Sequence, residues 1–399
     1  MLDLHRELIE GHVDVPRVGS VVHLAGRFPP FGIIGRDGDL VGSVDAYLRD
    51  LALNDNSPST GKSYANDLLR WFRLLWVLDT PWEKATEAEA AALVGWLRTA
   101  PNPQRRRRQL DAPRPGSVNL RTGKKYLTAG YAPSTINHTL TAVHGFYAYH
   151  GHYGRGPVAN PVPESAARRR ALAHHSPLEP FRGHKRARLR QRVTKAPPRA
   201  ISDALMDELY AAMNSDRDRA LIELYVSSGA RASELLGVEL GDIDWSGHRI
   251  FVVSKGSRER EPVPASPEGF LLLAAYLDQV GLPGQGQPVF RTIHGAEKPL
   301  TYWAMRRVVQ RANVRLGTNW TLHDLRHTAA TRMANDPSMS VVEVQTILRH
   351  ANLATTSRYV GASVEEIFDK LQEHFARPKV VRSFAPGYDA ADVTAVFGG

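Results

Sequence analysis

Cysteine and long apolar runs are both absent from this sequence. None of the 399 residues is a cysteine, which excludes disulfides, thiolate metal sites and a cysteine nucleophile. A covalent mechanism would therefore have to use Ser, Thr, Tyr, Lys, His or a carboxylate. No run of about 18 apolar residues occurs, and the opening MLDLHRE does not have the form of a signal peptide. We therefore expect a cytoplasmic protein of a reducing compartment, with no membrane partner.

A phosphate-binding loop of the form Gly-x-x-x-x-Gly-Lys-Ser/Thr is also absent, so the sequence indicates no ATP site and no cofactor. What is present is positive charge. The net charge is +10 and the pI about 9.8, which indicates a polyanionic partner. Since the membrane surface is disfavoured, nucleic acid is the better candidate.

The length and the hydrophobic fraction of 42% fit two globular domains. Residues 1–42 show no clear periodicity and are left unassigned. Amphipathic helices are then expected to start at Ser43, near Thr60, at the capping box of Thr86 and at Ser134. These four helices predict a small helical domain over residues 43–154.

Two basic stretches interrupt this pattern. The first, within residues 101–133, contains four consecutive arginines, Arg105, Arg106, Arg107 and Arg108. The second is a connector over residues 155–200, whose candidate DNA contacts are Lys185, Arg186, Arg188, Arg190 and Arg192. Such a charge run is often only a solvated segment. In a basic two-domain protein, however, contact with DNA phosphates is the better interpretation.

The second domain is expected over residues 201–376, followed by a tail at 377–399. Helical patterns lie at 202–213, 216–228, 231–237, 266–280, 301–315, 323–335, 340–349 and 354–373. A short β meander interrupts them, from Asp242 through 249–254 to 261–263. The fold class is thus mainly α with a small β meander.

Two basic residues of this domain allow opposed interpretations. Arg231 follows a glycine break at the start of a helix, where backbone amides favour an anion. It could equally pair with Glu234 in the same turn. Lys255 lies at the tip of the expected hairpin, where most lysines are only solvated edge charges.

Two further segments carry histidine, arginine and tyrosine. His323 and Arg326 are three apart, so they project from one face of a helix. His323 and His327 also have zinc-ligand spacing, but a zinc protease would need a glutamate beside the first histidine, and Arg326 would place a cation between the ligands. Tyr359 follows a helix that ends near His350, and alone it would be taken for a packing residue.

Together these segments resemble the tyrosine recombinase family, the integrases related to that of phage lambda. The resemblance covers residues 202–373 and rests on the order Arg, Lys, His-x-x-Arg, His, Tyr. Arg326 precedes Tyr359 by 33 positions and His350 precedes it by nine, both typical of the family. The four helices of 43–150 resemble its core-binding domain.

The resemblance implies the fold, the partners and the roles. Tyr359 attacks the scissile phosphate and leaves a 3′-phosphotyrosine, while Arg231 and Arg326 hold the non-bridging oxygens. Lys255 protonates the leaving 5′ oxygen, His323 assists proton transfer and His350 donates to the phosphate. The partners implied are double-stranded DNA and further copies of the chain, as a tetramer on two DNA sites. We expect an enzyme of bacterial type that is associated with the nucleoid when bound to DNA and belongs to a mobile element.

Physical chemistry supports these roles independently. A phenol with a pKa near 10 needs a base or a positive field to attack at neutral pH, and guanidinium groups match the geometry of phosphate oxygens. Two departures from the family pattern occur: Arg349 replaces the usual glycine before His350, and Ala230 replaces a bulkier apolar residue. The alternatives are a type IB topoisomerase, or a DNA-binding protein of the same fold without catalysis.

Overall fold

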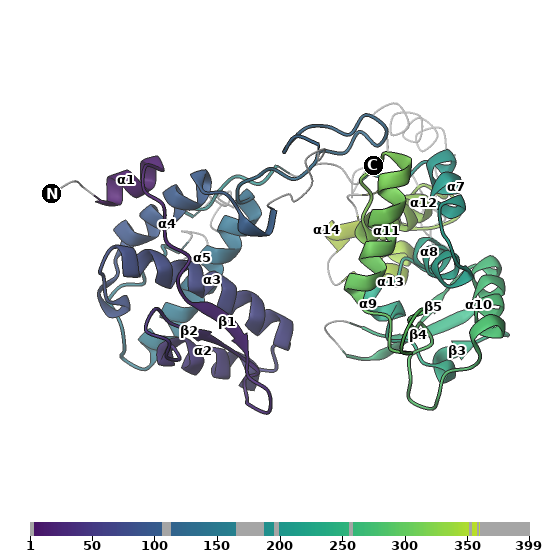
Figure 1. Cartoon of the computed structure of the whole chain (residues 1–399), viewed down its shortest axis with the longest axis horizontal. Coiled ribbons are helices and arrows are strands. Elements are labelled where there is room, and N and C mark those ends of the chain that lie inside the picture. The colour runs from purple at the N-terminus through teal and green to yellow at the C-terminus, as the bar shows by residue number, and fades with distance from the viewer. Residues whose placement is uncertain are drawn as a thin grey trace, which may run out of the picture. The chain divides into compact units, whose positions relative to one another are not determined.

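The structure is a computed structural model that describes residues 4–105, 113–164, 187–194, 199–254, 258–350, 353–356 and 359. The chain divides into two compact units, Met1–Ala196 and Pro197–Gly399 (Figure 1). Each unit is built around its own apolar core. Within these described ranges, no helix is long and apolar enough to cross a membrane.

The first unit is mostly helical, and it contains all four helices expected between 43 and 150. Its helices are α1 (Leu4–Glu10), α2 (Gly42–Leu53), α3 (Pro58–Val77), α4 (Glu87–Thr99) and α5 (Pro133–His152). Local sequence fixes their starts. Ser57 caps α3 by accepting from the Thr60 amide at 3.3 Å, and the predicted capping box of Thr86 and Glu89 opens α4.

Residues 1–42, which the sequence left unassigned, contain α1 and an antiparallel pair, β1 (Ser20–His23) and β2 (Phe31–Ile34). Helix α1 packs on α4, where Leu8 is fully buried. The close approach requires a glycine, because a Cβ at Gly95 would lie 2.5 Å from the Cα of Ile9. Such contacts between distant segments leave no periodic pattern in the sequence.

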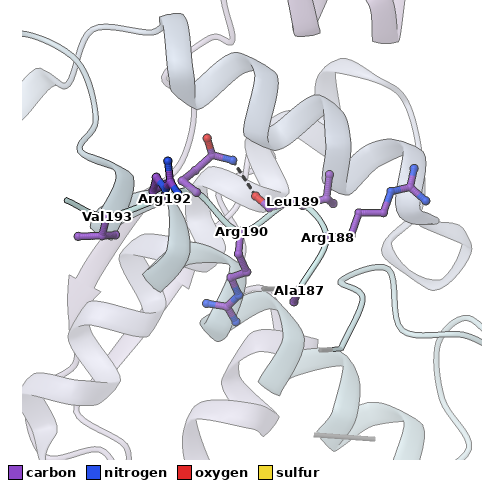
Figure 2. Close-up of a pocket in the computed structure, with 7 residues that line it drawn as sticks. Ala187, Arg188, Leu189, Arg190, Arg192 and Val193 are labelled. Atoms are coloured by element: carbon purple, nitrogen blue, oxygen red, sulfur yellow. Dashed lines mark hydrogen bonds between the residues drawn. The ribbon is translucent and has the colours of Figure 1, made fainter. Parts of the chain in front are cut away.

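Two described parts of the expected connector, 155–164 and 187–194, belong to the first unit. Val162 is buried in its core, and Leu189 packs against the same core. The guanidinium of Arg190 donates to the carbonyl of Asn137 at 2.6 Å and to the hydroxyl of Thr141 at 2.8 Å. Figure 2 shows this segment, residues 187–193, lining a pocket. Residues 187–194 are therefore part of the surface of the first unit.

The second unit combines helices with a three-stranded antiparallel sheet, as the sequence predicts. Its strands β3 (Ile243–Asp244), β4 (Arg249–Val253) and β5 (Arg260–Pro264) follow the order β3-β4-β5. In Figure 1 they lie together beside α10. Its described helices are α7 (Asp203–Ala211), α8 (Asp216–Ser228), α9 (Ala232–Leu235), α10 (Pro267–Val280), α11 (Tyr302–Leu316), α12 (Leu322–Ala334), α13 (Val341–Leu348) and α14 (Leu353–Thr356).

Helix α12 packs against both α8 and α13, and a glycine permits the contact. Gly229 ends α8 in the left-handed conformation, with a φ of +62°, which favours a residue without a side chain. A Cβ at this position would meet Cδ2 of Leu348 at 2.6 Å. The ends of α8 and α13 therefore converge on one face of α12.

Candidate active site

Arg326 lies at the centre of this convergence. Its side chain projects from α12 and is only 5% exposed. It donates to the carbonyl oxygens of Gly229 and Leu348, at the C-terminal ends of α8 and α13. Burial, together with the positive charges of Arg231 and Arg349, lowers the pKa of Arg326 to about 10, so it remains a cation at neutral pH. Since a guanidinium has five N–H donors, these two bonds hold its orientation and leave donors for an anion.

A second arginine is held by a buried carboxylate. Arg231 is the extended residue that precedes α9, and its guanidinium donates to Oε1 of Glu234 at 2.7 Å. Its backbone amide donates to the other carboxylate oxygen at 2.8 Å. From the sequence, Arg231 could either pair with Glu234 or bind an anion. The ion pair is present, and the side chain of Arg231 is still 30% exposed.

A third arginine joins this carboxylate from the end of α13. Nη2 of Arg349 donates to Oε2 of Glu234 at 2.6 Å, and its Nε lies 4.0 Å from Oε2 of Glu261 on β5. Burial alone would raise the pKa of Glu234, but the hydrogen bonds from Arg231 and the charges of both arginines lower it below its ordinary value. Glu234 therefore stays ionised and ties α9 to the end of α13.

The backbone of Arg349 is left-handed, with a φ of 51° and a ψ of 50°. This conformation costs a residue with a Cβ about 1 kcal/mol or more. It ends α13 and turns the chain so that His350 follows, with the amide of His350 bonded to the carbonyl of Gln345 at 3.1 Å. A glycine, which is usual at this position in the family that the sequence resembles, could adopt this backbone without strain, whereas this chain has an arginine that makes an ion pair.

His350 faces Tyr359 from this turn. Their rings are stacked with a centroid separation of 6.4 Å and an interplanar angle of 12°, and Nδ1 of His350 lies 2.9 Å from the hydroxyl of Thr356. Burial, followed by the charges of Arg326 and Arg231, lowers the pKa of His350 to about 4. The imidazole is therefore neutral at pH 7 and can still donate one N–H bond.

The ring of Tyr359 is seated in a small apolar cluster and is 8% exposed. The cluster contains Ala330 of α12 together with Val344 and Leu348 of α13. The hydroxyl of Tyr359 lies 2.5 Å from Nδ1 of His327. The fold therefore fixes the tyrosine by its ring and directs its hydroxyl to a histidine on the helix that carries Arg326.

The chain is similar in sequence to a known family and to known proteins. Residues 200–366 match the model of the phage integrase family. The chain is 28% identical to tyrosine recombinase XerC of Halalkalibacterium halodurans over 291 residues, which cover 67% of this chain and 86% of that protein.

Residues 200–366 therefore match the phage integrase family, and the chain is similar to tyrosine recombinases. It is also 31% identical to XerC of Herpetosiphon aurantiacus and 32% identical to XerC of Bifidobacterium longum, and these matches cover 48% and 46% of this chain. The chain spans 65% and 53% of the length of these two relatives.

Solved structures share the fold. A lambda integrase dimer bound to a COC′ core site matches with a TM-score of 0.54 at 17% identity, covering 80% of this chain and 94% of that one. XerH site-specific recombinase bound to difH substrate matches with a TM-score of 0.52 at 17% identity, covering 81% and 83%.

The structure brings together five of the six residues that the sequence predicts to be catalytic. Arg231, Arg326, His350 and Tyr359 lie around the junction of α8, α12 and α13, and His323 lies on α12. His323 lies one turn before His327 on α12, with the two ring centroids 4.1 Å apart. Lys255 lies outside the described residues. The base of its hairpin is described, and there the amide of Ser254 donates to the carbonyl of Glu259 at 2.9 Å.

The residues that the sequence predicts to contact DNA have different surroundings. Arg105 donates to the carbonyl of Gly130 at 2.8 Å, Arg190 is bonded to α5 as described above, and Arg188 forms an exposed ion pair with Glu87 at 2.9 Å. Arg192 is exposed. The remaining predicted contacts, Arg106, Arg107, Arg108, Lys185 and Arg186, lie outside the described residues.

The sequence missed His327 as a residue of the site. It was weighed only as a zinc ligand paired with His323, an interpretation that Arg326 disfavours. The signal that could have found it is its position one residue after Arg326 and one turn after His323. However, which side of α12 meets Tyr359 depends on how α13 packs, and the helical period alone does not determine that packing.

Proposed function

We propose that this recombinase cleaves and rejoins double-stranded DNA at specific sites through a covalent 3′-phosphotyrosine formed by Tyr359. One observation carries the proposal. The hydroxyl of the buried Tyr359 contacts a histidine ring, beside two guanidinium groups that are held in place by hydrogen bonds. A phenol in this setting has both things that it needs to attack a phosphate, a proton acceptor and a nearby positive field.

In the proposed reaction, Arg231 and Arg326 bind the non-bridging oxygens of the scissile phosphate. The buried bonds of Arg326 to two carbonyls fix it before the substrate arrives, so no reorganisation is needed during the reaction. His350, neutral at pH 7, donates a hydrogen bond to the same phosphate. Lys255 protonates the leaving 5′ oxygen and His323 assists proton transfer. Because the phosphotyrosine bond retains the energy of the broken linkage, rejoining requires no ATP.

We further propose a division of labour between the two units. The helical domain of residues 43–154 binds the DNA around the core site, the catalytic domain of 201–376 performs the reaction, and 155–200 joins them. The basic charge of the chain supports DNA as the partner. The active assembly is a tetramer on two DNA sites in the cytoplasm of a bacterial-type cell.

The biological role that we propose is recombination of a mobile element. The Arg-rich insert at 101–133 and the long basic connector, which add DNA-binding charge to a minimal recombinase, support it. Sequencing the DNA that is covalently attached to the protein in cells tests this role. Ends of an integrated element would support it, whereas a single chromosomal site without such ends would contradict it.

A nicked suicide DNA substrate tests the proposed chemistry. Cleavage near the nick releases a short strand, so the covalent intermediate cannot be rejoined and accumulates. The wild-type protein should give a denaturant-resistant DNA adduct, and Tyr359→Phe should give none. If the wild-type protein forms no adduct on any bound site, the catalytic proposal is wrong. Plasmid relaxation without strand exchange between two sites would favour a topoisomerase.

A further inference from the structure

We infer that His327 is a further catalytic residue, which accepts the phenolic proton of Tyr359 when the tyrosine attacks DNA. This inference rests on the proposed function and assigns one of its steps to a residue outside the predicted set. The hydroxyl of Tyr359 lies 2.5 Å from Nδ1 of His327, within the range over which a general base acts. The two ring centroids are 5.5 Å apart.

The surroundings of the other candidate bases favour His327. His350 stacks on the face of the tyrosine ring, and its Nδ1 is engaged with Thr356 at 2.9 Å. His323 lies one turn earlier on α12 and makes an edge contact with the ring of His327. Arg326 is a cation at neutral pH and cannot accept a proton.

Helix α12 gives His327 a fixed position relative to the phosphate-binding arginine. Arg326 is its immediate neighbour in the chain and is anchored by two backbone carbonyls. The apolar cluster that holds the ring of Tyr359 includes Ala330, one turn further along the same helix. A single rigid element therefore sets the phosphate-binding cation, the base and the seat of the nucleophile.

Attack by Tyr359 combines a proton transfer with an exchange of bonds at phosphorus. The O–H bond of Tyr359 breaks and its proton bonds to Nδ1 of His327, which requires the tautomer with hydrogen on Nε2. The phenolic oxygen forms a bond to phosphorus, and the bond from phosphorus to the 5′ oxygen breaks. The leaving oxygen takes a proton from the acid, Lys255 in the proposed function. In rejoining, protonated His327 returns its proton to the departing tyrosine.

The test compares His327→Asn and His327→Gln with the wild type on two suicide substrates. One has a normal scissile phosphate, and the other has sulfur in place of the bridging 5′ oxygen. A thiolate leaves without protonation because the pKa of a thiol is low, about 8.5. A variant that lacks the general acid should therefore cleave the sulfur substrate at the wild-type rate. Asn places an amide oxygen near the position of Nδ1, so it can keep the hydrogen bond to Tyr359 but cannot act as a base.

Both His327 variants should lose roughly 10²–10⁴-fold in cleavage rate, and the loss should be equal on the two substrates. Lys255→Ala should be impaired on the oxygen substrate only. Wild-type rates for His327→Asn would overturn the inference, since His327 would then only position the tyrosine. If the sulfur substrate restores the cleavage rate of either His327 variant, His327 acts as the acid and the inference is overturned.

Two controls separate the loss of the base from a loss of folding, of DNA binding or of the proposed activity itself. DNA binding and thermal unfolding of both variants should match the wild type, and a variant that unfolds is replaced in the comparison by the other. If the wild-type protein forms no adduct on either substrate, the proposed function fails, rather than the assignment of the base. The wild type could be active and His323→Asn, rather than the His327 variants, could lose cleavage rate equally on both substrates. In that case the base is His323 instead.

Discussion

Arg349 combines an unfavourable backbone with a favourable side chain. Its left-handed φ of 51° is costly for any residue with a Cβ, yet its guanidinium pairs with the buried Glu234 at 2.6 Å. Because Glu234 also binds Arg231, which we propose binds phosphate, the ion pair of Arg349 connects Arg231 to the turn that carries His350. We interpret Arg349 as a positioning residue, whose backbone strain is offset by its ion pair.

Two substitutions separate these effects. Arg349→Gly and Arg349→Ala both lose the ion pair, but only alanine keeps the cost of the left-handed backbone. We therefore expect the glycine variant to be more stable than the alanine variant by about 1 kcal/mol. Urea denaturation of the two proteins measures the difference. Equal stability would show that the backbone conformation at this turn relaxes when the side chain is removed.

His350 predicts a pH dependence of stability. Its pKa in the folded protein is lowered to about 4 by burial and by Arg326 and Arg231, against an ordinary value near 6.5. The unfolded chain therefore binds a proton that the folded chain does not, and stability falls as the pH drops from about 6.5 toward 4. His350→Asn should flatten this part of the stability curve, measured by denaturation at pH 4.5 and 7.5. An unchanged slope would contradict the assignment.

At the scale of the element, the junction of α8, α12 and α13 assembles the site. Gly229→Ala would force a Cβ to within 2.6 Å of Leu348 and impose a side chain on a φ of +62°. We expect a loss of about 2–4 kcal/mol in stability and slower cleavage, because the carbonyl of Gly229 orients Arg326. Gly241→Ala is the control, since its Cβ would meet no atom within 4 Å, and it should change little.

The arginines of the basic segment 187–194 should be of two kinds, one that stabilises the first unit and one that binds DNA. Arg190 is tied to α5 through Asn137 and Thr141, so Arg190→Ala should lower the stability of the first unit. Arg192 is exposed, so Arg192→Ala should weaken DNA binding, reduce its salt dependence and leave stability unchanged. Fluorescence anisotropy at several salt concentrations checks the binding. A loss of DNA affinity for Arg190→Ala alone would reverse this division.

Helix positions and ends could be predicted from the sequence where local chemistry determines them. The capping box at Thr86 and the start of α8 after Ser215 are examples. The contacts of Glu234 with Arg349 and of Tyr359 with His327 could not, because they join segments that are 115 and 32 positions apart. The docking of α1 on α4 through Gly95 escaped prediction for the same reason.

At the scale of the whole molecule, the chain is basic and has two units, and the described residues of the candidate catalytic site all lie in the second unit. The motif order that indicated the family also indicated which residues meet, because a shared fold places them. The ion pairs of Arg349 with Glu234 and Glu261 could be found only from the structure. The central claim is that Tyr359 is the nucleophile.

Mapping the covalent attachment site tests that claim most directly. The wild-type protein is trapped on a suicide substrate and digested, and the peptide that carries the nucleotide is sequenced by mass spectrometry. We predict a single phosphotyrosyl linkage at Tyr359, joined to the 3′ end of the cleaved strand. Attachment at any other residue, or to the 5′ end of the strand, would contradict the account.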